Sequence, residues 1–533
     1  MDPVTRIVAA PAVLAVVLAT TGCTSLVVPD TSAPAEDGQV LRWAMHRELN
    51  DPDHVLNGFL TFGWNVFDPL VKLDDELQPV PNMAERWEVS DDRLRWTFHL
   101  RDDGRWTNGD PLTADDYVFG WRDSGIYAFI PIVGAHEFSE CERIREESGD
   151  ETKDCEPLWS DVALKALDER TLEVTLVSPQ PWLPNAIGGF ACMCYAPLHR
   201  ATVERYGDEW VEAGHMVSSG PFRLAEWDAD SLILVKDEAW RDAARVTLDR
   251  VTVTYYPDYE STLDAVTSDE ADIAILPAHM SDAVSVAPVL GTGYVGLNVD
   301  NIPDPWQRRA MALALDRAAI IDRVRGGIHR VATSLTADEI PGFAHIAPSF
   351  ITPESDMEAA ARLMAMAEEP RTEIDLWFNE VESRRWTSEE VAATWEGLGI
   401  RTTLRSVPDF RQYLEFLARG ESDAYLAGWG YDFPDAINLL ELWSCDGGEA
   451  TASGFCDPQF DALLDQAADE LDEDSRVALY AGAEAMLTGE QGAMPAIPID
   501  WYSQPLVTGD AWANALRFNA MSQIDLTTVR PAR

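Results

Sequence analysis

Alternating apolar and polar residues mark several strands in the first half of the chain. Residues 84–106 alternate on both sides of a turn at Ser90, Asp91 and Asp92, a pattern that predicts a β-hairpin. Further strands are predicted at 172–177, 232–236 and 251–256. The N-terminal half is therefore expected to mix α and β structure.

Helical spacing of apolar residues begins near residue 305. Residues 305–324 open with a proline and place Trp306, Ala310 and Leu313 on one stripe. Proline is favoured in the first turn of a helix, and such a stripe is typical of one buried face. The pattern predicts one helix over 305–324.

Strand and helix patterns then alternate from residue 372 to residue 429. A capping box at Thr387 and Glu390 is expected to start the first helix, with Gly397 and Gly420 as stops. The predicted order is strand 372–378, helix 386–396, strand 400–407, helix 409–419 and strand 423–429. Such alternation predicts parallel strands with crossover helices.

The loops after these strands carry charges of both signs. In an open parallel sheet, ligands bind beyond the carboxyl ends of the strands. The loop after residue 378 holds Glu380, Glu382, Arg384 and Arg385, and the loop after residue 429 is Gly430–Asp435. A molecule with both an ammonium and a carboxylate would suit this edge.

The N-terminal residues are typical of export. An apolar run at 7–20 follows Arg6, is too short to span a bilayer, and ends shortly before Cys23. Residues 1–23 are therefore predicted to be a signal peptide with a lipoprotein processing box, in which Cys23 would be acylated. Residues 24–37 would form a flexible tether. Secretion without the lipid stays open as an alternative.

Size and charge narrow the classes of partner. The chain has 533 residues, is 46% hydrophobic and carries a formal net charge of −52. It can bury a large core and should divide into two or three lobes. Nucleic acid and anionic membrane surfaces are excluded as partners, because both would repel this charge.

Six cysteines remain once Cys23 is set aside, an even number in a compartment that favours disulfides. Cys141 with Cys155, and Cys445 with Cys456, bracket short loops and are candidate disulfides. Cys192 and Cys194 alternate along an extended stretch, and their pairing stays open. No CxxC motif or close histidine pair indicates a metal site.

Several spaced motifs then carry a family resemblance. They are AERWEV at 84–89, WTFHLRDDGRW at 96–106, GDPLTADD at 109–116, SGPFRLAEW at 219–227, QRRAMALALDR at 307–317 and LAGWGYDFPD at 426–435. In this order, the chain resembles the extracytoplasmic solute-binding proteins of peptide ABC importers, the oligopeptide- and dipeptide-binding family (family 5). The resemblance covers nearly the whole mature chain.

The resemblance implies an α/β fold of the large, type II periplasmic-binding-protein kind, with two lobes that close about a hinge. An extra subdomain would be inserted in the N-terminal lobe. The implied boundaries are 38–66, 199–290 and 497–533 for the main part of lobe I, 67–198 for the inserted subdomain, and 291–496 for lobe II.

The resemblance also implies ligand-binding residues. Asp432 falls where the family places the carboxylate that pairs with a peptide's free amino terminus, although a turn carboxylate before Phe433 and Pro434 is the structural alternative. Arg384 would meet the ligand's carboxyl end, or be an exposed ion-pair partner. The expected pocket walls, each of which would otherwise be plain core, are Trp429, Phe410, Tyr127 and Tyr502.

Leu426 departs from the family pattern, because some oligopeptide binders carry a basic residue at that position for the ligand's carboxylate. Preferred peptide length, and peptide chemistry itself, therefore stay open. Relatives of this fold also bind nickel complexes, opines and sugars.

The expected function is capture of oligopeptides by a monomeric lipoprotein outside the cell membrane, which delivers them to an ABC permease without a cofactor. A binder of sugar, nickel complex or opine is the alternative, and a secreted hydrolase is the weaker one. No G-x-S-x-G, H-E-x-x-H or P-loop motif supports an enzyme. The 19 tryptophans would suit sugar stacking, but Trp87, Trp96 and Trp106 lie in strand-rich sequence where core aromatics belong.

Overall fold

The structure is a computed structural model of the chain. It describes residues 39–46, 62–126, 130–149, 153–189, 194–278, 280, 285–343, 350–512 and 515–531. The predicted signal peptide, the tether, Cys23, Tyr127 and Cys192 lie outside the described residues. Among the described helices, none has the length and apolar character that crossing a membrane requires.

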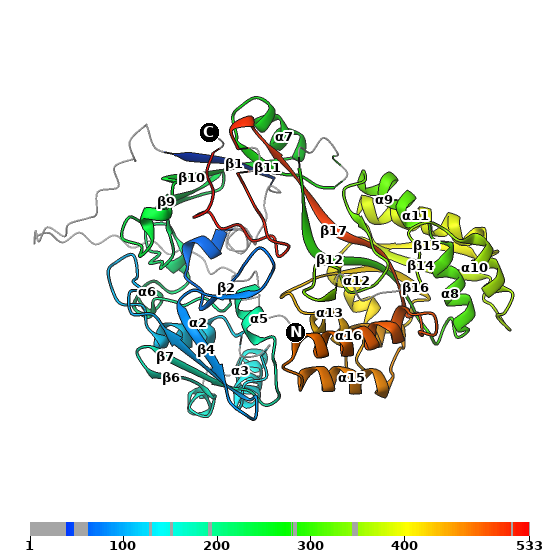
Figure 1. The fold of residues 1–533 in the computed structure, drawn as a ribbon, viewed down its shortest axis with the longest axis horizontal. Coiled ribbons are helices and arrows are strands. Elements are labelled where there is room, and N and C mark those ends of the chain that lie inside the picture. Colours follow the sequence, from blue (N-terminus) through cyan, green and yellow to red (C-terminus); the bar gives the residue numbers. More distant parts are fainter. Residues whose placement is uncertain are drawn as a thin grey trace, which may run out of the picture.

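A sheet of 11 strands runs through the molecule (Figure 1). Its strands, in spatial order, are β15 (Arg401–Val407), β14 (Glu373–Asn379), β16 (Ala424–Gly430), β12 (Ser285–Leu297), β17 (Ala496–Thr508), β11 (Ile273–Ile275), β1 (Val40–His46), β10 (Arg250–Tyr256), β9 (Ser231–Lys236) and β8 (Phe222–Trp227), with β13 (Arg330–Val331) paired to β17.

Two long strands, β12 and β17, connect the two halves of the molecule (Figure 1). They pair in antiparallel fashion, and their register shifts between Pro288 and Thr292. A second register shift follows between Gly293 and Tyr294. The exact domain boundaries stay a prediction.

The second half contains the predicted parallel unit. β14 pairs in parallel with β15 and with β16, and the connections contain α11 (Glu382–Glu396) and α12 (Phe410–Leu417). Asp409 begins α12 by accepting a hydrogen bond from the Gln412 amide at 2.8 Å. The alternation of strand and helix patterns therefore predicted this topology correctly.

The predicted start of α11 was wrong. The helix begins at Glu382, four residues before the expected start, and Thr387 donates within it to the Ser383 carbonyl at 2.8 Å. Thr387 and Glu390 are thus mid-helix residues, because the charged segment at 382–385 has good helix formers and continues the helix toward its N-terminus. Glu382, Arg384 and Arg385 lie in its first turns and not in a loop.

The single helix predicted over 305–324 was also wrong. Two helices occupy the segment, α8 (Pro305–Ala314) and α9 (Arg317–Arg325). Asp316 separates them, because its side chain accepts a hydrogen bond from the Ala319 amide at 2.9 Å and so caps a new helix.

Buried arginines explain part of the motif at 307–317. The Arg317 guanidinium is fully buried and donates to main-chain carbonyls, including that of Pro498 at 2.7 Å. Arg308 donates to Ala493, and Arg309 to Gly492. Burial lowers the pKa of Arg317 to about 9 and that of Arg308 to about 10. These side chains fix α8 and α9 against the segment that leads into β17.

A smaller sheet, in the order β4-β5-β7-β6, forms the inserted subdomain, and β4 and β5 are the predicted hairpin. Trp96 and Trp106 are buried and Trp87 packs against the same core, as expected. The remaining strands are β2 (Val71–Leu73), β3 (Pro79–Pro81), β4 (Ala84–Val89), β5 (Arg95–Leu100), β6 (Leu164–Asp168) and β7 (Thr171–Thr175).

The remaining α-helices cover the sheets (Figure 1). They are α2 (Ala114–Asp123), α3 (Ala135–Ser148), α4 (Glu156–Trp159), α5 (Leu183–Gly189), α6 (Arg200–Tyr206), α7 (Tyr259–Thr267), α10 (Met357–Met364), α13 (Ile437–Leu440), α14 (Gly448–Ser453), α15 (Pro458–Ala468) and α16 (Glu473–Thr488). Short 3-10 helices lie at Gly207–Val211, Ala243–Arg245, Glu441–Trp443 and Asp510–Trp512.

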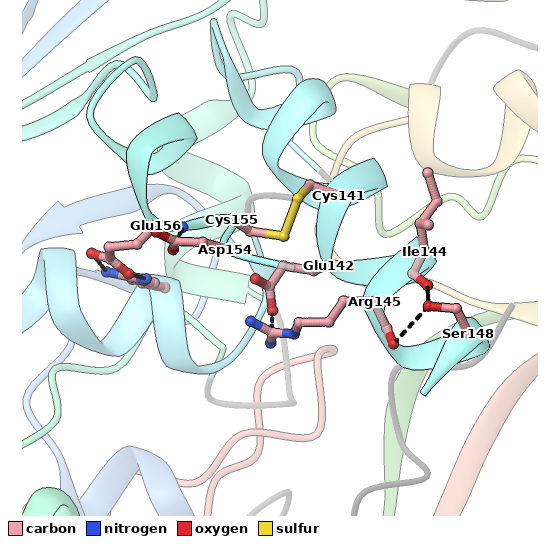
Figure 2. The surroundings of a disulfide bond; sticks show 9 residues. Cys141, Glu142, Ile144, Arg145, Ser148, Asp154, Cys155 and Glu156 are labelled. Atoms are coloured by element: carbon pink, nitrogen blue, oxygen red, sulfur yellow. Dashed lines mark hydrogen bonds and ion pairs between the residues drawn. A yellow bond between two sulfur atoms is a disulfide. The ribbon is translucent and has the colours of Figure 1, made fainter. Parts of the chain in front are cut away.

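Disulfide bonds join Cys141 to Cys155 and Cys445 to Cys456. Figure 2 shows the first of these, which ties α3 to the segment that enters α4. Cys194 is also disulfide-bonded. Both described pairs close short loops, as their spacing suggested.

Candidate functional site

Among the described strands, none pairs with one edge of β16 over its last residues. Its parallel pairing with β14 is confined to Ala424 and Tyr425, whereas its pairing with β12 continues to Gly430. Just beyond, the Tyr431 amide donates to the Leu290 carbonyl on the β12 side. Because peptide groups alternate along a strand, those of Leu426, Gly428 and Gly430 point away from β12.

Two side chains hold the point where β14 and β16 separate. Tyr413 on α12 is buried and donates its hydroxyl to the Leu426 carbonyl at 2.8 Å. Arg384 on α11 donates to the same carbonyl at 2.9 Å. The Arg384 guanidinium therefore lies at the beginning of the unpaired edge.

Asp432 lies just beyond the other end of this edge. Its side chain is half-buried and has one described hydrogen-bond donor, the Asn438 amide, at 3.4 Å. Burial raises the pKa of Asp432, and the hydrogen bond from Asn438 offsets part of that rise. A half-buried carboxylate with one weak donor is suited to receive a cation.

Asn438, at the second position of α13, organises this end of the strand. Its side-chain oxygen accepts hydrogen bonds from the Trp429 indole and from the Asp432 amide, both at 2.9 Å. Trp429 is thereby fixed beside Asp432. Asn438 was missed from the sequence, because its spacing from Asp432 is a common one in loops.

The inserted subdomain approaches lobe II beside Asp432. A methyl group at Gly189 would lie 3.1 Å from the Phe433 Cα and 3.0 Å from the Pro434 Cδ, so the two chains are in close contact there. Burial, and next the charge of Asp432, raise the pKa of buried Tyr195. Asp432 thus lies between the lobes and not on an outer surface.

Tyr502, on β17, lies against three glycines of β12 and β16, Gly291, Gly293 and Gly428, which together form a glycine channel. A methyl group at Gly428 would lie 2.0 Å from the Tyr502 hydroxyl, and methyl groups at Gly291 and Gly293 would also meet the side chains of Tyr502 and Asp500. Burial, and next the charge of Asp500, raise the pKa of Tyr502 to about 12, while nearby Arg384 opposes this rise. Tyr502 therefore covers one face of β12 and β16 beside Arg384.

Phe410 is not gathered with these residues. It is the first residue of α12, and 53% of its surface is exposed. The structure brings Asp432, Trp429, Arg384 and Tyr502 together around the C-terminal part of β16. Tyr127 lies outside the described residues.

Two further carboxylates accompany Asp432. Asp435 is buried, and Arg476 on α16 lies 3.6 Å from it. Glu441 begins the 3-10 helix after α13; part of its side chain is exposed, but the surrounding protein still desolvates its carboxyl group. Desolvation, and then repulsion from Asp432 and Asp435, raise the pKa of Glu441 to about 7.

Two cavities lie near these residues, and of the two only the smaller is lined by residues of both lobes. One of about 700 Å³ includes Gly188 and the C-terminal segment 515–530, and one of about 280 Å³ includes Pro434 and Asp435. The larger has the volume of a small-molecule site.

One group of metal-ligand types was missed from the sequence. Glu209, Glu212 and His215 bring potential donor atoms within 4.8 Å of one another in lobe I. Both glutamates are exposed, and the group lies outside the sheet edge described above. It has no part in that site.

Comparison with known proteins places the chain in a family. The sequence model of the bacterial extracellular solute-binding proteins, family 5 (middle part), matches residues 78–450. A probable deoxycholate-binding periplasmic protein, YgiS of Escherichia coli, is 29% identical over 501 residues, which are 89% of this chain and 90% of YgiS. The dipeptide-binding protein DppE of Bacillus subtilis is 28% identical, with 84% of each chain covered. The periplasmic oligopeptide-binding protein OppA of Salmonella typhimurium is 27% identical, with 81% of each covered.

Solved structures share the fold. The unliganded open form of the periplasmic murein tripeptide binding protein MppA superimposes with a TM-score of 0.76, at 24% identity, covering 93% of this chain and 98% of that one. OppA of Haemophilus influenzae in complex with RPPGFSPFR gives a TM-score of 0.66 at 21% identity, with 93% and 100% covered. The two-lobed α/β fold is thus confirmed, and the chain belongs to the bacterial extracellular solute-binding proteins of family 5.

Proposed function

We propose that this protein is the peptide-binding component of an ABC importer. It would capture oligopeptides between its lobes, outside the cytoplasm, and deliver them to a membrane permease. Acylated Cys23 would anchor it to the outer face of the cell membrane. Relatives named as peptide-binding proteins at 27–28% identity over more than four fifths of the chain support this proposal.

The single observation that carries the proposal is the unpaired edge of β16 with Arg384 at its beginning and Asp432 beyond its end. An extended peptide can pair its main chain with such an edge whatever its side chains are. Asp432 would pair with the amino terminus, and Arg384 would attract the carboxyl terminus.

The separation of the two charges sets a length. Leu426 and Asp432 are six positions apart along one strand, so at about 3.3 Å per residue the span is roughly 20 Å at most. A peptide that used both ends would therefore have up to about six residues.

A second candidate ligand is an amphipathic carboxylate such as deoxycholate. The relative named probable deoxycholate-binding protein supports it. The cavity of about 700 Å³ combines apolar Trp64, Leu73 and Ile524 with basic Lys72 and Arg517, but it is also lined by the acidic residues Asp74, Asp75, Glu76 and Asp525, which would repel a carboxylate.

A thermal-shift screen separates these candidates. Ligands that bind only the folded state stabilise it, by about 2.7 kcal/mol when the free ligand is at a hundredfold excess over Kd, and so raise Tm. We expect a rise with pools of di- to hexapeptides and none with deoxycholate or free sugars. Stabilisation by deoxycholate or sugar, without any peptide effect, would contradict peptide capture.

A further inference from the structure

The segment just after Asp432 is part of a contact between the lobes. Phe433 packs against the hydrophobic core of lobe I as well as against that of lobe II. A methyl group at Gly189, the last residue of α5, would lie 3.0 Å from the Pro434 Cδ and 3.2 Å from the Phe433 Cβ. Gly189 is itself fixed to the main part of lobe I, because the side-chain amide of Gln523 donates to its carbonyl at 3.1 Å. Lobe II therefore touches lobe I one residue beyond the proposed amine-binding carboxylate.

The inserted subdomain contributes apolar side chains to the same contact. Leu77 and Trp182 belong to the hydrophobic core of lobe II, and they are only 2% and 7% exposed. Leu73 is partly buried against the same core. Separation of the lobes at this point would return part of this apolar surface to water, which is unfavourable. The contact therefore has a driving force that does not depend on a ligand.

The contact leaves room for further closure. The cavity of about 280 Å³ lies between Pro181 and Pro184 of the inserted subdomain and Ile340 and Pro341 of lobe II. Because protein interiors are closely packed, a cavity of this size allows the two surfaces to approach further. The lobes thus touch at one point and can still move toward each other around it.

The contact and the proposed peptide site lie on opposite sides of Asp432 along the chain. The unpaired edge runs from Leu426 to Gly430, whereas the contact begins at Phe433. Figure 1 shows α5 on the side of the inserted subdomain that faces lobe II, apart from the place where β12 and β17 cross between the lobes. The lobes are therefore joined both at the crossing strands and at this contact, and the edge of β16 stays available to a ligand.

We propose that Phe433, Leu77 and Trp182 form a contact that already holds the lobes together beside Asp432 before a peptide binds. Its effect on affinity rests on the proposed peptide-binding function, whereas the contact itself does not. Lobes that are already joined lose less freedom when a peptide closes them. If the contact is broken, a smaller fraction of the molecules is ready to bind, and the apparent affinity falls by that fraction.

Small-angle X-ray scattering of the protein without ligand tests the contact. Gly189→Leu places a branched side chain against Phe433 and Pro434 and should force the lobes apart there. We expect the radius of gyration to rise by roughly 0.5–1 Å, from about 24 Å for a compact chain of this length. The matched control Gly214→Leu adds the same side chain at a site in lobe I where a methyl group has no atom within 4 Å, and should leave the radius unchanged.

Phe433→Ala is a second variant, which removes the contact where Gly189→Leu obstructs it. It should raise the radius of gyration by a similar amount, and it decides the question if Gly189→Leu does not fold. Circular dichroism confirms that each variant is folded.

Calorimetric titration with an alanine pentapeptide links the contact to capture. Both variants should bind the peptide about three- to tenfold more weakly than the wild type. The N-acetylated peptide should lose affinity by the same factor, because the Asp432 carboxylate is intact in both variants.

Two results would overturn the inference. One is a wild-type radius of gyration in both folded variants, and the other is a larger radius without any loss of peptide affinity. If the wild type bound no peptide, the proposed function would fail, while the radius of gyration would still decide whether the contact holds the lobes together.

Discussion

Individual charged residues differ in how far the sequence alone could identify them. Asp432 and Arg384 follow from the family resemblance; the strand pattern also predicted charged residues at this edge of the sheet, although Arg384 lies in α11 and not in the loop after β14. Glu441 follows from neither, because it comes after a four-residue helix, and acidic residues are common in a chain with 92 of them. The rise of its pKa depends on how the chain folds around α13, which no periodicity predicts.

The pKa of Glu441 predicts a pH dependence of stability. Its folded-state pKa is raised from 4.5 to about 7, so its favourable contribution is complete below pH 4.5 and is lost as the pH rises through 7. Glu441→Gln stays neutral throughout. In the protein without ligand, differential scanning calorimetry should give equal Tm values at pH 4.5 and a variant Tm higher by about 1–2 °C at pH 8. A variant that is less stable at pH 8 would show that Glu441 is not repelled by Asp432.

The unpaired edge of β16 was predicted only in part. The strand itself and its parallel partner were predicted from hydrophobic pattern. The separation of β14 from β16 was not, because it depends on Tyr413 and Arg384, which reach the Leu426 carbonyl from two different helices. The early start of α11 was missed for a similar reason, since the helix propensity of residues 382–385 outweighed the apparent capping box.

Glycines in β16 provide a matched test of the channel beneath Tyr502. Gly428→Ala would place a methyl group 2.0 Å from the Tyr502 hydroxyl, and the ring would have to move. Overpacking of this kind costs about 1–3 kcal/mol, so in a chain of this length the Tm should fall by about 1–3 °C, and peptide affinity should fall with it.

Gly430→Ala is the control on the same strand, because a methyl group there has no atom within 4 Å. Its Tm should match the wild type. If both variants had the wild-type Tm, Tyr502 would not be held by the glycine channel.

The division of the whole molecule into two lobes was expected from the sequence. The spaced motifs indicated the two-lobed fold, and the described residues have it, with β12 and β17 crossing between the lobes (Figure 1). Buried Arg317 and its neighbours join α8 and α9 to the segment that enters β17. Where the lobes meet beside Asp432, a methyl group at position 189 would lie 3.0 Å from the Pro434 Cδ and would press on its neighbours, a detail that requires the packed structure. Ligand captured there would hold the lobes together.

In the proposed function, the Asp432 carboxylate between the lobes binds a peptide's free amino terminus. The most direct test of this binding is calorimetric titration of one alanine peptide, with a free or an N-acetylated amino terminus, into the wild type and Asp432→Asn. Acetylation is expected to weaken binding to the wild type about 10- to 100-fold, the range for a hydrogen bond to a charged group, and to have little effect on Asp432→Asn. Equal loss of both peptides in Asp432→Asn, or wild-type affinity for the acetylated peptide, would contradict it.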